Sequence, residues 1–101
     1  MKEAELAQQL EAAQQERDAM LEAMLFAAGE PVSVQRLAAV LETEPAVMKE
    51  EMEGFASRYN YKRSGLRIIQ MEDSYQICTR SEHFEAVQKL LNPASSPDLS
   101  R

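Results

Sequence analysis

The stretch from Lys2 to Ala28 contains neither glycine nor proline, and Gly29 and Pro31 follow it directly. Because these two residue types are the strongest helix breakers, the stretch predicts one long helix, or two that abut, ending near Ala28. The second half of this segment, "AMLEAMLFAA", is apolar almost all round and is expected to be buried. The first half has few apolar residues and is expected to lie outside the core.

The first half of this helix, residues 1–17, is interpreted as a helical leader. Its apolar pattern alternates four- and three-residue spacings, which is typical of a coiled-coil seam. The positions in this pattern are Leu6, Leu10, Ala13, Arg17, Met20 and Met24. The arginine interrupts the seam, so a frayed, glutamine-rich leader is the alternative. The residues leave both interpretations open.

Two shorter helices are expected after the break. Ser33 is a good N-cap residue and starts a helix over residues 34–41. Thr43 is expected to cap the next helix, with Pro45 tolerated in its first turn. Four residues of that helix recur at spacings of four, three and four, which predicts one buried apolar stripe. They are Met48, Met52, Phe55 and Tyr59.

A β-hairpin and a last helix complete the predicted fold. The segments "LRIIQM" and "YQICTR" flank "EDS" and read as two paired strands. Ser81 is expected to cap a helix that carries Phe84, Val87, Leu90 and Leu91, before the polar residues 92–101 form a linker. The predicted class is mainly α with a small β-hairpin (α+β). The order helix, helix, helix, strand, strand, helix describes a winged helix-turn-helix in residues 18–91, with an N-terminal helical extension.

Both faces of the hairpin are apolar. If Asp73 and Ser74 form a two-residue loop, one face carries five side chains, namely Leu66, Ile68, Tyr75, Ile77 and Thr79. The other face carries Ile69, Met71 and Cys78. A single hairpin can bury only one face against its own helices, so the second face must meet another surface or stay exposed. We therefore expect a protein partner, and a second copy is the simplest choice because symmetric dimers are the commonest oligomers.

The helix that would enter a DNA groove is acidic. In a helix-turn-helix protein the second helix of the pair reads the major groove, and here its first turns carry Glu50, Glu51 and Glu53 against Lys49. The net charge is −6 and no third of the chain is basic. Like charges about 4 Å apart repel by roughly 1 kcal/mol even in water, so this helix is badly placed to read DNA. The cations left for a weak phosphate contact are Lys62, Arg63, Arg67 and Arg80.

The residue types that catalysis requires are scarce. His83 is the only histidine, Cys78 is the only cysteine, and the three glycines are too far apart for a phosphate-binding loop. A metal site built on these two residues would lack further ligands at sensible spacing, so no cofactor is expected. No apolar run approaches the roughly 20 residues of a membrane span. A non-enzymatic protein of the cytoplasm, without membrane contact, is expected.

Three segments resemble one known family. "MLFAAGEPVS", "GLRIIQMEDSYQICTR" and "FEAVQKLL" are similar to the N-terminal winged-helix domain of bacterial segregation and condensation protein B, over residues 19–101. The resemblance implies a second winged-helix domain after the linker, which is absent from this chain. It also implies a non-enzymatic protein that dimerises through its N-terminal domains. Its implied partner is the kleisin subunit, segregation and condensation protein A, and through it the SMC ATPase at the nucleoid.

Two functional hypotheses follow. The leading one is a homodimerising interaction module of a bacterial SMC-kleisin chromosome segregation and condensation complex, with no sequence-specific DNA binding. The alternative is a winged-helix transcriptional regulator that binds DNA as a dimer. The residues predicted to form the protein interface are Leu6, Leu10, Met20, Met24, Ile69, Met71 and Cys78.

Overall fold

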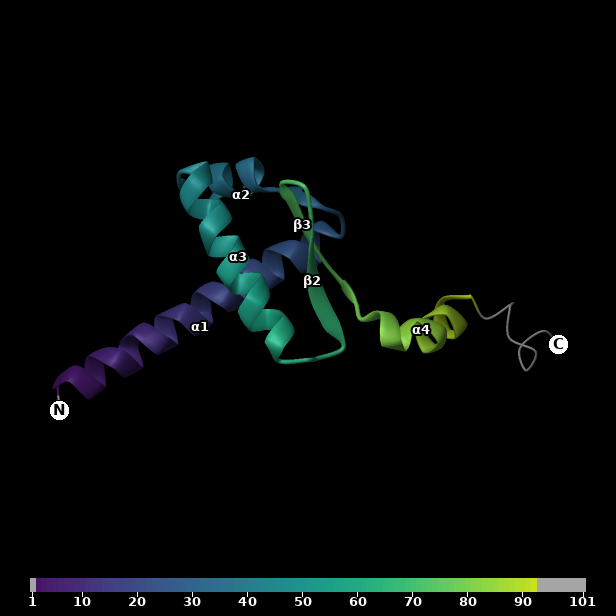
Figure 1. Cartoon of the computed structure of the whole chain (residues 1–101), viewed down its shortest axis with the longest axis horizontal. Coiled ribbons are helices and arrows are strands. Elements are labelled where there is room, and N and C mark those ends of the chain that lie inside the picture. The colour runs from purple at the N-terminus through teal and green to yellow at the C-terminus, as the bar shows by residue number, and fades with distance from the viewer. Residues whose placement is uncertain (1, 93–101) are drawn as a thin grey trace.

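The computed structural model of the chain describes residues 2–92 and has the predicted winged-helix architecture (Figure 1). Its elements are α1 (Lys2–Ala28), β1 (Val32–Ser33), α2 (Val34–Val40), α3 (Pro45–Tyr61), β2 (Leu66–Met71), β3 (Ser74–Thr79), the 3-10 turn η1 (Ser81–His83) and α4 (Phe84–Leu91). The helix-turn-helix pair is α2 and α3, and β2 with β3 forms the wing. The predicted fold class, mainly α with a small β-hairpin, is confirmed.

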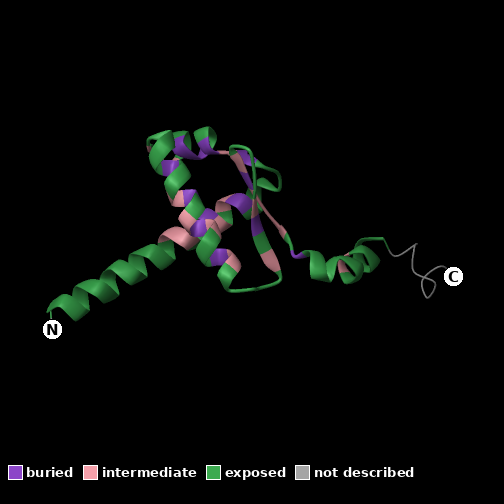
Figure 2. Ribbon diagram, viewed as in Figure 1, coloured by how far each residue is buried: buried purple, intermediate pink, exposed green. Residues whose placement is uncertain are grey.

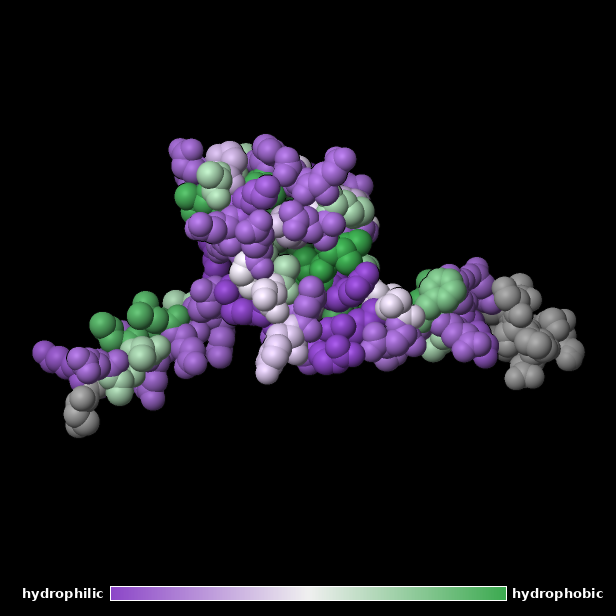
Figure 3. Space-filling model, viewed as in Figure 1, coloured by the Kyte–Doolittle hydropathy of each residue, from purple (hydrophilic) through white to green (hydrophobic). Residues whose placement is uncertain are grey.

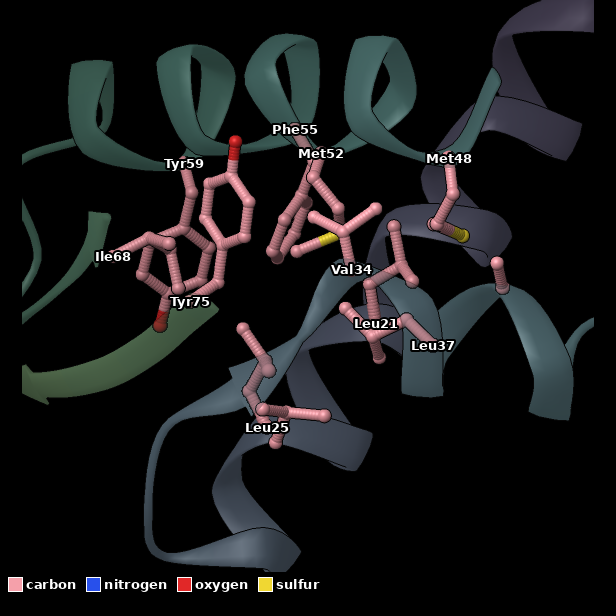
Figure 4. Close-up of a cluster of buried hydrophobic side chains, with 12 residues drawn as sticks. Leu21, Leu25, Val34, Leu37, Met48, Met52, Phe55, Tyr59, Ile68 and Tyr75 are labelled. Atoms are coloured by element: carbon pink, nitrogen blue, oxygen red, sulfur yellow. The ribbon is translucent and has the colours of Figure 1, made fainter. Parts of the chain in front are cut away.

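One hydrophobic core joins α1, α2, α3 and the sheet (Figure 4). Its members are Leu21, Leu25, Val32, Val34, Leu37, Ala38, Met48, Met52, Phe55, Tyr59, Ile68 and Tyr75. The four predicted stripe residues of α3 are all among them, so the stripe is confirmed. A compact domain of 100 residues has a radius of gyration of about 13 Å. The observed 17.6 Å is larger because the first half of α1 and α4 project from the core (Figures 1 and 2).

Helix α1 runs without a break from Lys2 to Ala28, as predicted. Its residues 2–16 are exposed, which agrees with the expected position of the leader outside the core. The expectation that the second half is buried all round is wrong. Only Leu21 and Leu25 are buried, and Phe26 is 70% exposed. The reason is that α2, α3 and the sheet all pack on one side of this helix, which leaves its other side in solvent.

The helix caps match the sequence predictions only in part. The side chain of Ser33 accepts a hydrogen bond from the backbone N–H of Arg36 at 3.0 Å, which confirms the first cap. The cap predicted at Thr43 is wrong, because α3 begins at Pro45 with Glu44 in the cap position and no side-chain cap bond. The hydroxyl of Thr43 instead donates to the carbonyl of Leu41 at 3.2 Å.

The sheet has three strands in the order β1-β3-β2, one more than predicted. The additional strand, β1, is only two residues long and pairs Val32 with Tyr75, which is too short for a sequence pattern to show. The hairpin turn is also one residue earlier than expected. Met71 pairs with Ser74, so the turn residues are Glu72 and Asp73. This change moves the pairing by two residues, which leaves every side chain on the face predicted for it.

The chain after the sheet differs from the prediction. A 3-10 turn, η1, follows β3, and neither η1 nor α4 has a side-chain cap bond, so the predicted Ser81 cap is wrong. Helix α4 has no buried residue. The predicted linker, residues 92–101, lies outside the described residues except for Asn92. Among residues 2–92, no helix combines the length and the hydropathy that a membrane crossing requires.

Candidate protein-interaction site

The seven residues predicted to form an interface lie in three separate places. Leu6 and Leu10, 61% and 68% exposed, lie on the projecting half of α1. Met20 and Met24 are half-buried at the side of the same helix, where it meets the core. The remaining three are on the hairpin and are Ile69, Met71 and Cys78. Figure 3 shows hydrophobic side chains on the leader, on the body and on α4. The predicted interface residues therefore lie on three different parts of the described chain.

The hairpin has the two apolar faces that the sequence predicts. On the inner face Ile68 and Tyr75 are 4% and 1% exposed and belong to the core. On the outer face Met71 is 40% exposed, whereas Ile69 and Cys78 are half-buried. Arg67 pairs with Cys78 across the strands and is exposed on this same face. The outer face thus carries three apolar side chains together with the polar side chains of Arg67, Ser74 and Gln76.

Polar contacts join the middle of α1, from the last residue of the leader onward, to α3. The guanidinium of Arg17 donates two hydrogen bonds to the carboxylate of Glu51, the longer at 3.0 Å. Arg58 donates two bonds of 3.0 Å to Asp18. One turn further along α1, the hydroxyl of Tyr59 donates to Glu22 at 2.9 Å. Together these contacts join residues 17–22 of α1 to residues 51–59 of α3.

These contacts also shift the pKa values of Asp18 and Tyr59. The hydrogen bonds from Arg58 lower the pKa of the Asp18 carboxyl, against a smaller opposite effect of burial. Burial, and secondarily the bond to Glu22, raise the pKa of the Tyr59 hydroxyl. Asp18 therefore stays ionised in the folded protein at a lower pH than it does in the unfolded chain.

The lowered pKa of Asp18 predicts a pH-dependent contribution to stability. A carboxyl with a depressed folded pKa stabilises the fold above its unfolded pKa of about 3.9, and this contribution is lost as the pH falls through the folded value. Asp18→Asn should cost a few tenths to about 1 kcal/mol at pH 7, because the pair is partly solvent-exposed. The difference from the parent should shrink as the pH falls below the unfolded pKa and through the lower folded pKa. Urea unfolding at pH 7, 4 and 2.5 measures this.

A matched control is Glu16→Gln, which makes the same change of charge on the same helix. Glu16 is exposed and makes no ion pair within residues 2–92. Its effect should be small and should not follow the pH profile of Asp18→Asn. Equal profiles for the two variants would show that the general acidity of α1, rather than the Asp18–Arg58 pair, is responsible.

An apolar groove runs between the end of α1 and α2. Its lining residues are Met24, Ala27, Ala28, Val32, Arg36, Leu37 and Val40. Val40 is 60% exposed at its edge, and Arg36 is the only charged residue of the lining. Of the predicted interface residues, only Met24 lies here.

Three cations near the helix that would read DNA form ion pairs, whereas the exposed Lys62 lies over the ring of Tyr59 and forms no ion pair within residues 2–92. Lys49 pairs with Asp73 at 3.7 Å, and Arg63 pairs with Glu82 at 3.3 Å. Arg58 is bound to Asp18, whereas Glu50 and Glu53 are exposed. Two of the three glutamates on which the sequence argument against DNA reading rests are therefore exposed on this helix. The described surface of α3 is one that repels phosphate.

The structure contradicts the sequence prediction that Arg80 is available for a phosphate contact. This residue was a candidate for phosphate contact, but it is the one buried charged residue of the described chain, at 8% exposure. Its Nε donates to the carbonyl of Ser64 at 2.6 Å, and its Nη2 donates to that of Asn60 at 2.8 Å. Carbonyls at a helix C-terminus carry partial negative charge, so this guanidinium caps α3 from another element. It cannot reach a nucleic acid.

The residues that could have carried catalysis are not assembled into a site. His83 is exposed in η1, and Cys78 is half-buried in β3. Residues 2–92 contain no group of three or more histidine, cysteine, aspartate or glutamate side chains that could hold a metal ion.

One exposed apolar surface was absent from the predicted interface. The sequence places Phe84, Leu90 and Leu91 on a helix, and the structure leaves them 62%, 77% and 67% exposed. Val87, on the same side, is half-buried. The spacing indicated an apolar stripe, but it could not indicate that the stripe would meet no other part of the described chain.

Fold and surface together define a winged-helix protein whose exposed features suit contact with protein rather than with DNA. The family model described as "Segregation and condensation complex subunit ScpB" matches residues 19–101. The chain belongs to this family. It is 37% identical over 83 residues to segregation and condensation protein B of Alkaliphilus metalliredigens, covering 82% of this chain and 44% of that protein. Over 70 residues it is 41% identical to the Desulforamulus reducens protein, covering 69% and 39%.

Solved structures agree with this assignment. A crystal structure of a dimer of the ScpB N-terminal domain complexed with ScpA peptide matches with a TM-score of 0.67 and 29% identity, over 77% of this chain and 98% of that one. ScpB from Mycobacterium tuberculosis matches with a TM-score of 0.70 and 24% identity, over 82% and 52%, which supports the fold. The chain spans less than half the length of the two relatives named above, and the leader before residue 19 lies outside the family match.

Proposed function

We propose that this chain is the N-terminal interaction module of a bacterial SMC-kleisin chromosome segregation and condensation complex. It acts without catalysis, as a homodimer that binds the kleisin subunit, segregation and condensation protein A, and through it the SMC ATPase. The observation that carries this function is the match to the N-terminal ScpB domain solved as a dimer with an ScpA peptide. The complex would work in the cytoplasm, at the nucleoid.

The surface chemistry supports the same function. The exposed carboxylates of α3 and its engaged cations disfavour polyphosphate, whereas the apolar outer face of the hairpin favours a protein partner. The alternative of a DNA-binding regulator requires a basic surface on this helix. No observation on the described residues favours that alternative, so it is not proposed.

Titration of the chain with the kleisin segment of the same organism tests the proposed function. Calorimetry should give saturable binding, and sedimentation of the free chain should give the mass of a dimer. A fluorescent DNA duplex added at low salt should bind no better than micromolar and without sequence preference. Absence of kleisin binding, together with tight, salt-sensitive DNA binding, would contradict the proposed function and favour a DNA-binding transcriptional regulator.

The outer face of the hairpin has its own prediction. Ile69→Glu/Met71→Glu should convert the dimer to a monomer, because it places two carboxylates where apolar area is buried on pairing. The parent dimer should be insensitive to salt, since its interface is apolar. Sedimentation at 0.05 and 0.5 M salt measures both. Gln70→Glu, which adds a charge to the same strand on the opposite face, is the matched control and should stay dimeric.

A further inference from the structure

We infer that α1 of one copy of the chain pairs antiparallel with α1 of a second copy, so that each leader lies along the C-terminal half of the other helix. The surface involved is called the α1 seam, and it consists of Leu6, Leu10, Ala13, Arg17, Met20 and Met24. This pairing rests on the self-association proposed above and adds a second contact between copies to the outer hairpin face. The leader lies before the residues that the family model matches, so the family match does not supply this contact.

The α1 seam is an uncovered side of one unbroken helix. Because α1 is continuous, the alternating four- and three-residue spacing keeps all the seam positions on one side of it. Leu6 and Leu10 are 61% and 68% exposed, and Met20 and Met24 are only half-buried. Figures 1 and 2 show the leader projecting from the body with an exposed surface, and Figure 3 shows hydrophobic side chains on it. A short helix outside a core is marginal in water, so a second helix laid along the seam would stabilise it.

Arg17 decides the direction of the pairing. In a parallel pair each seam position meets itself, so the two Arg17 side chains would face each other in the middle of an apolar contact. In the antiparallel register that sets each a position of the heptad against a d position, Arg17 instead lies on Ala13 of the other copy. The small alanine side chain leaves room for the arginine. The remaining layers of this register pair Leu6 with Met24 and Leu10 with Met20.

The structure already pairs the charge of Arg17 within its own copy. Its guanidinium donates two hydrogen bonds to the Glu51 carboxylate of α3, the longer at 3.0 Å. The two paired side chains line an open hollow together with Leu10 and Ala13, so the surface beside the seam continues past the arginine. The interruption of the seam that the sequence indicates is therefore compensated by a carboxylate from α3.

The C-terminal end of the seam lies in the apolar groove between α1 and α2, whose lining includes Met24, Ala27 and Arg36. In the antiparallel register, Leu6 of the second copy lies on Met24 in this groove, and Glu3 of the second copy lies at the level of Ala27. Glu3 and Arg36 are both exposed, and neither forms an ion pair within residues 2–92. The second copy therefore brings an apolar side chain to the apolar lining and a carboxylate to its one charged residue.

A parallel pair of the same helices fits less well. It leaves the groove and Arg36 without a partner, and it brings the two Glu3 carboxylates together. The antiparallel pair has one unfavourable contact, because Glu16 of each copy lies close to the twofold axis. Both of these carboxylates are exposed, so water and salt screen their repulsion. Because a short seam gives only a weak contact, the pairing accompanies the hairpin contact rather than replacing it.

Cysteine cross-linking tests the direction and the register of the pairing. All chains carry Cys78→Ser, which removes the only thiol of the parent. A first chain also carries Leu10→Cys, and a second chain, with an affinity tag, carries Met20→Cys. After mixing, exchange and mild oxidation, the dominant product should join position 10 of the first chain to position 20 of the second. Dominant links between two 10 positions and between two 20 positions would indicate a parallel pair and overturn the inference.

A first chain with Cys78→Ser/Gln8→Cys is the matched control. It places the thiol within a turn of Leu10 but on the opposite side of the same exposed helix segment. It should cross-link to position 20 several-fold less than the chain with Leu10→Cys does. Equal yields from positions 8 and 10 would indicate random collision and overturn the pairing.

A charge reversal tests the contact at the groove. Introduced into both cross-linking chains, Glu3→Arg alone or Arg36→Glu alone should lower the yield of the link between positions 10 and 20 several-fold, because like charges then meet. The double variant Glu3→Arg/Arg36→Glu should restore the yield. Both residues are exposed, so neither change is expected to disturb the fold. A loss that the double variant does not restore would contradict this contact.

Failure of this pairing and failure of the proposed function give different results. If the parent sediments as a dimer and binds the kleisin segment but the link between positions 10 and 20 does not form, the pairing is overturned and the proposed function stands. A parent that stays monomeric at every concentration would overturn the pairing and the dimer together. The kleisin titration would then report separately on the remaining function.

Discussion

Phe55→Ala should lower the free energy of unfolding by about 3–5 kcal/mol, the cost of removing a buried aromatic ring from a packed core. Phe55 is 1% exposed at the centre of the α3 stripe, and its ring lies 5.7 Å from that of Tyr59. A domain of this size has a total stability of about 5–15 kcal/mol, so the variant should be unfolded in part at 37 °C. Urea denaturation followed by circular dichroism measures the change.

Phe26→Ala is the matched control, because it removes the same ring from a site that is 70% exposed. Its effect should stay within about 0.5 kcal/mol of the parent, as is usual for surface positions. If both variants lost the same stability, the core would not be centred on α3 as the structure describes. A loss at Phe26 in the kleisin titration alone would instead mark that side of α1 as part of the partner surface.

The second large effect is expected at Arg80. Arg80→Ala should cost about 2–4 kcal/mol, because it leaves the carbonyls of Ser64 and Asn60 without their charged donor. The end of α3 loses its cap at the same time. Arg80→Lys keeps the charge but cannot make both bonds with one ammonium group, so it should recover only part of the loss. Urea denaturation should give the highest free energy of unfolding for the parent, an intermediate value for Arg80→Lys and the lowest for Arg80→Ala.

Arg67→Ala controls for the loss of an arginine from the same hairpin. Arg67 is exposed and makes no hydrogen bond or ion pair within residues 2–92 that resembles those of Arg80. Its removal should change stability by less than about 0.5 kcal/mol. Should Arg80→Ala prove equally mild, the buried guanidinium would have no structural role.

The fold was predictable where local patterns are strong. The stretch without glycine or proline specified α1, the four-three-four spacing specified the buried side of α3, and alternation specified both faces of the hairpin. The faces survived an error in the position of the turn, because a change of two residues in pairing leaves side-chain direction unchanged. The acidic outer surface of α3 was likewise readable, since Glu50 and Glu53 lie opposite the stripe.

Other features could not be predicted from local patterns. Strand β1 is two residues long and exists only because β3 lies beside it. The caps expected from Thr43 and Ser81 do not form. Helix α3 begins one residue later than Thr43 would require, with Glu44 at its N-cap, and Ser81 is the first residue of a 3-10 turn. The interface residues Leu6 and Leu10 remain a prediction, because their exposure on the leader is compatible with pairing and with solvent alike.

The sequence by itself determined which side chains share a helix side or a strand face, because spacing along a regular backbone decides that without reference to the rest of the chain. It thereby determined the order of the four helices and the hairpin strands, the apolar stripes and the sign of the exposed charge. Only the tertiary structure decided which of these surfaces meet. It buried Arg80 beneath the end of α3 and left the stripe of α4 uncovered, because both outcomes depend on the direction in which the chain leaves the sheet.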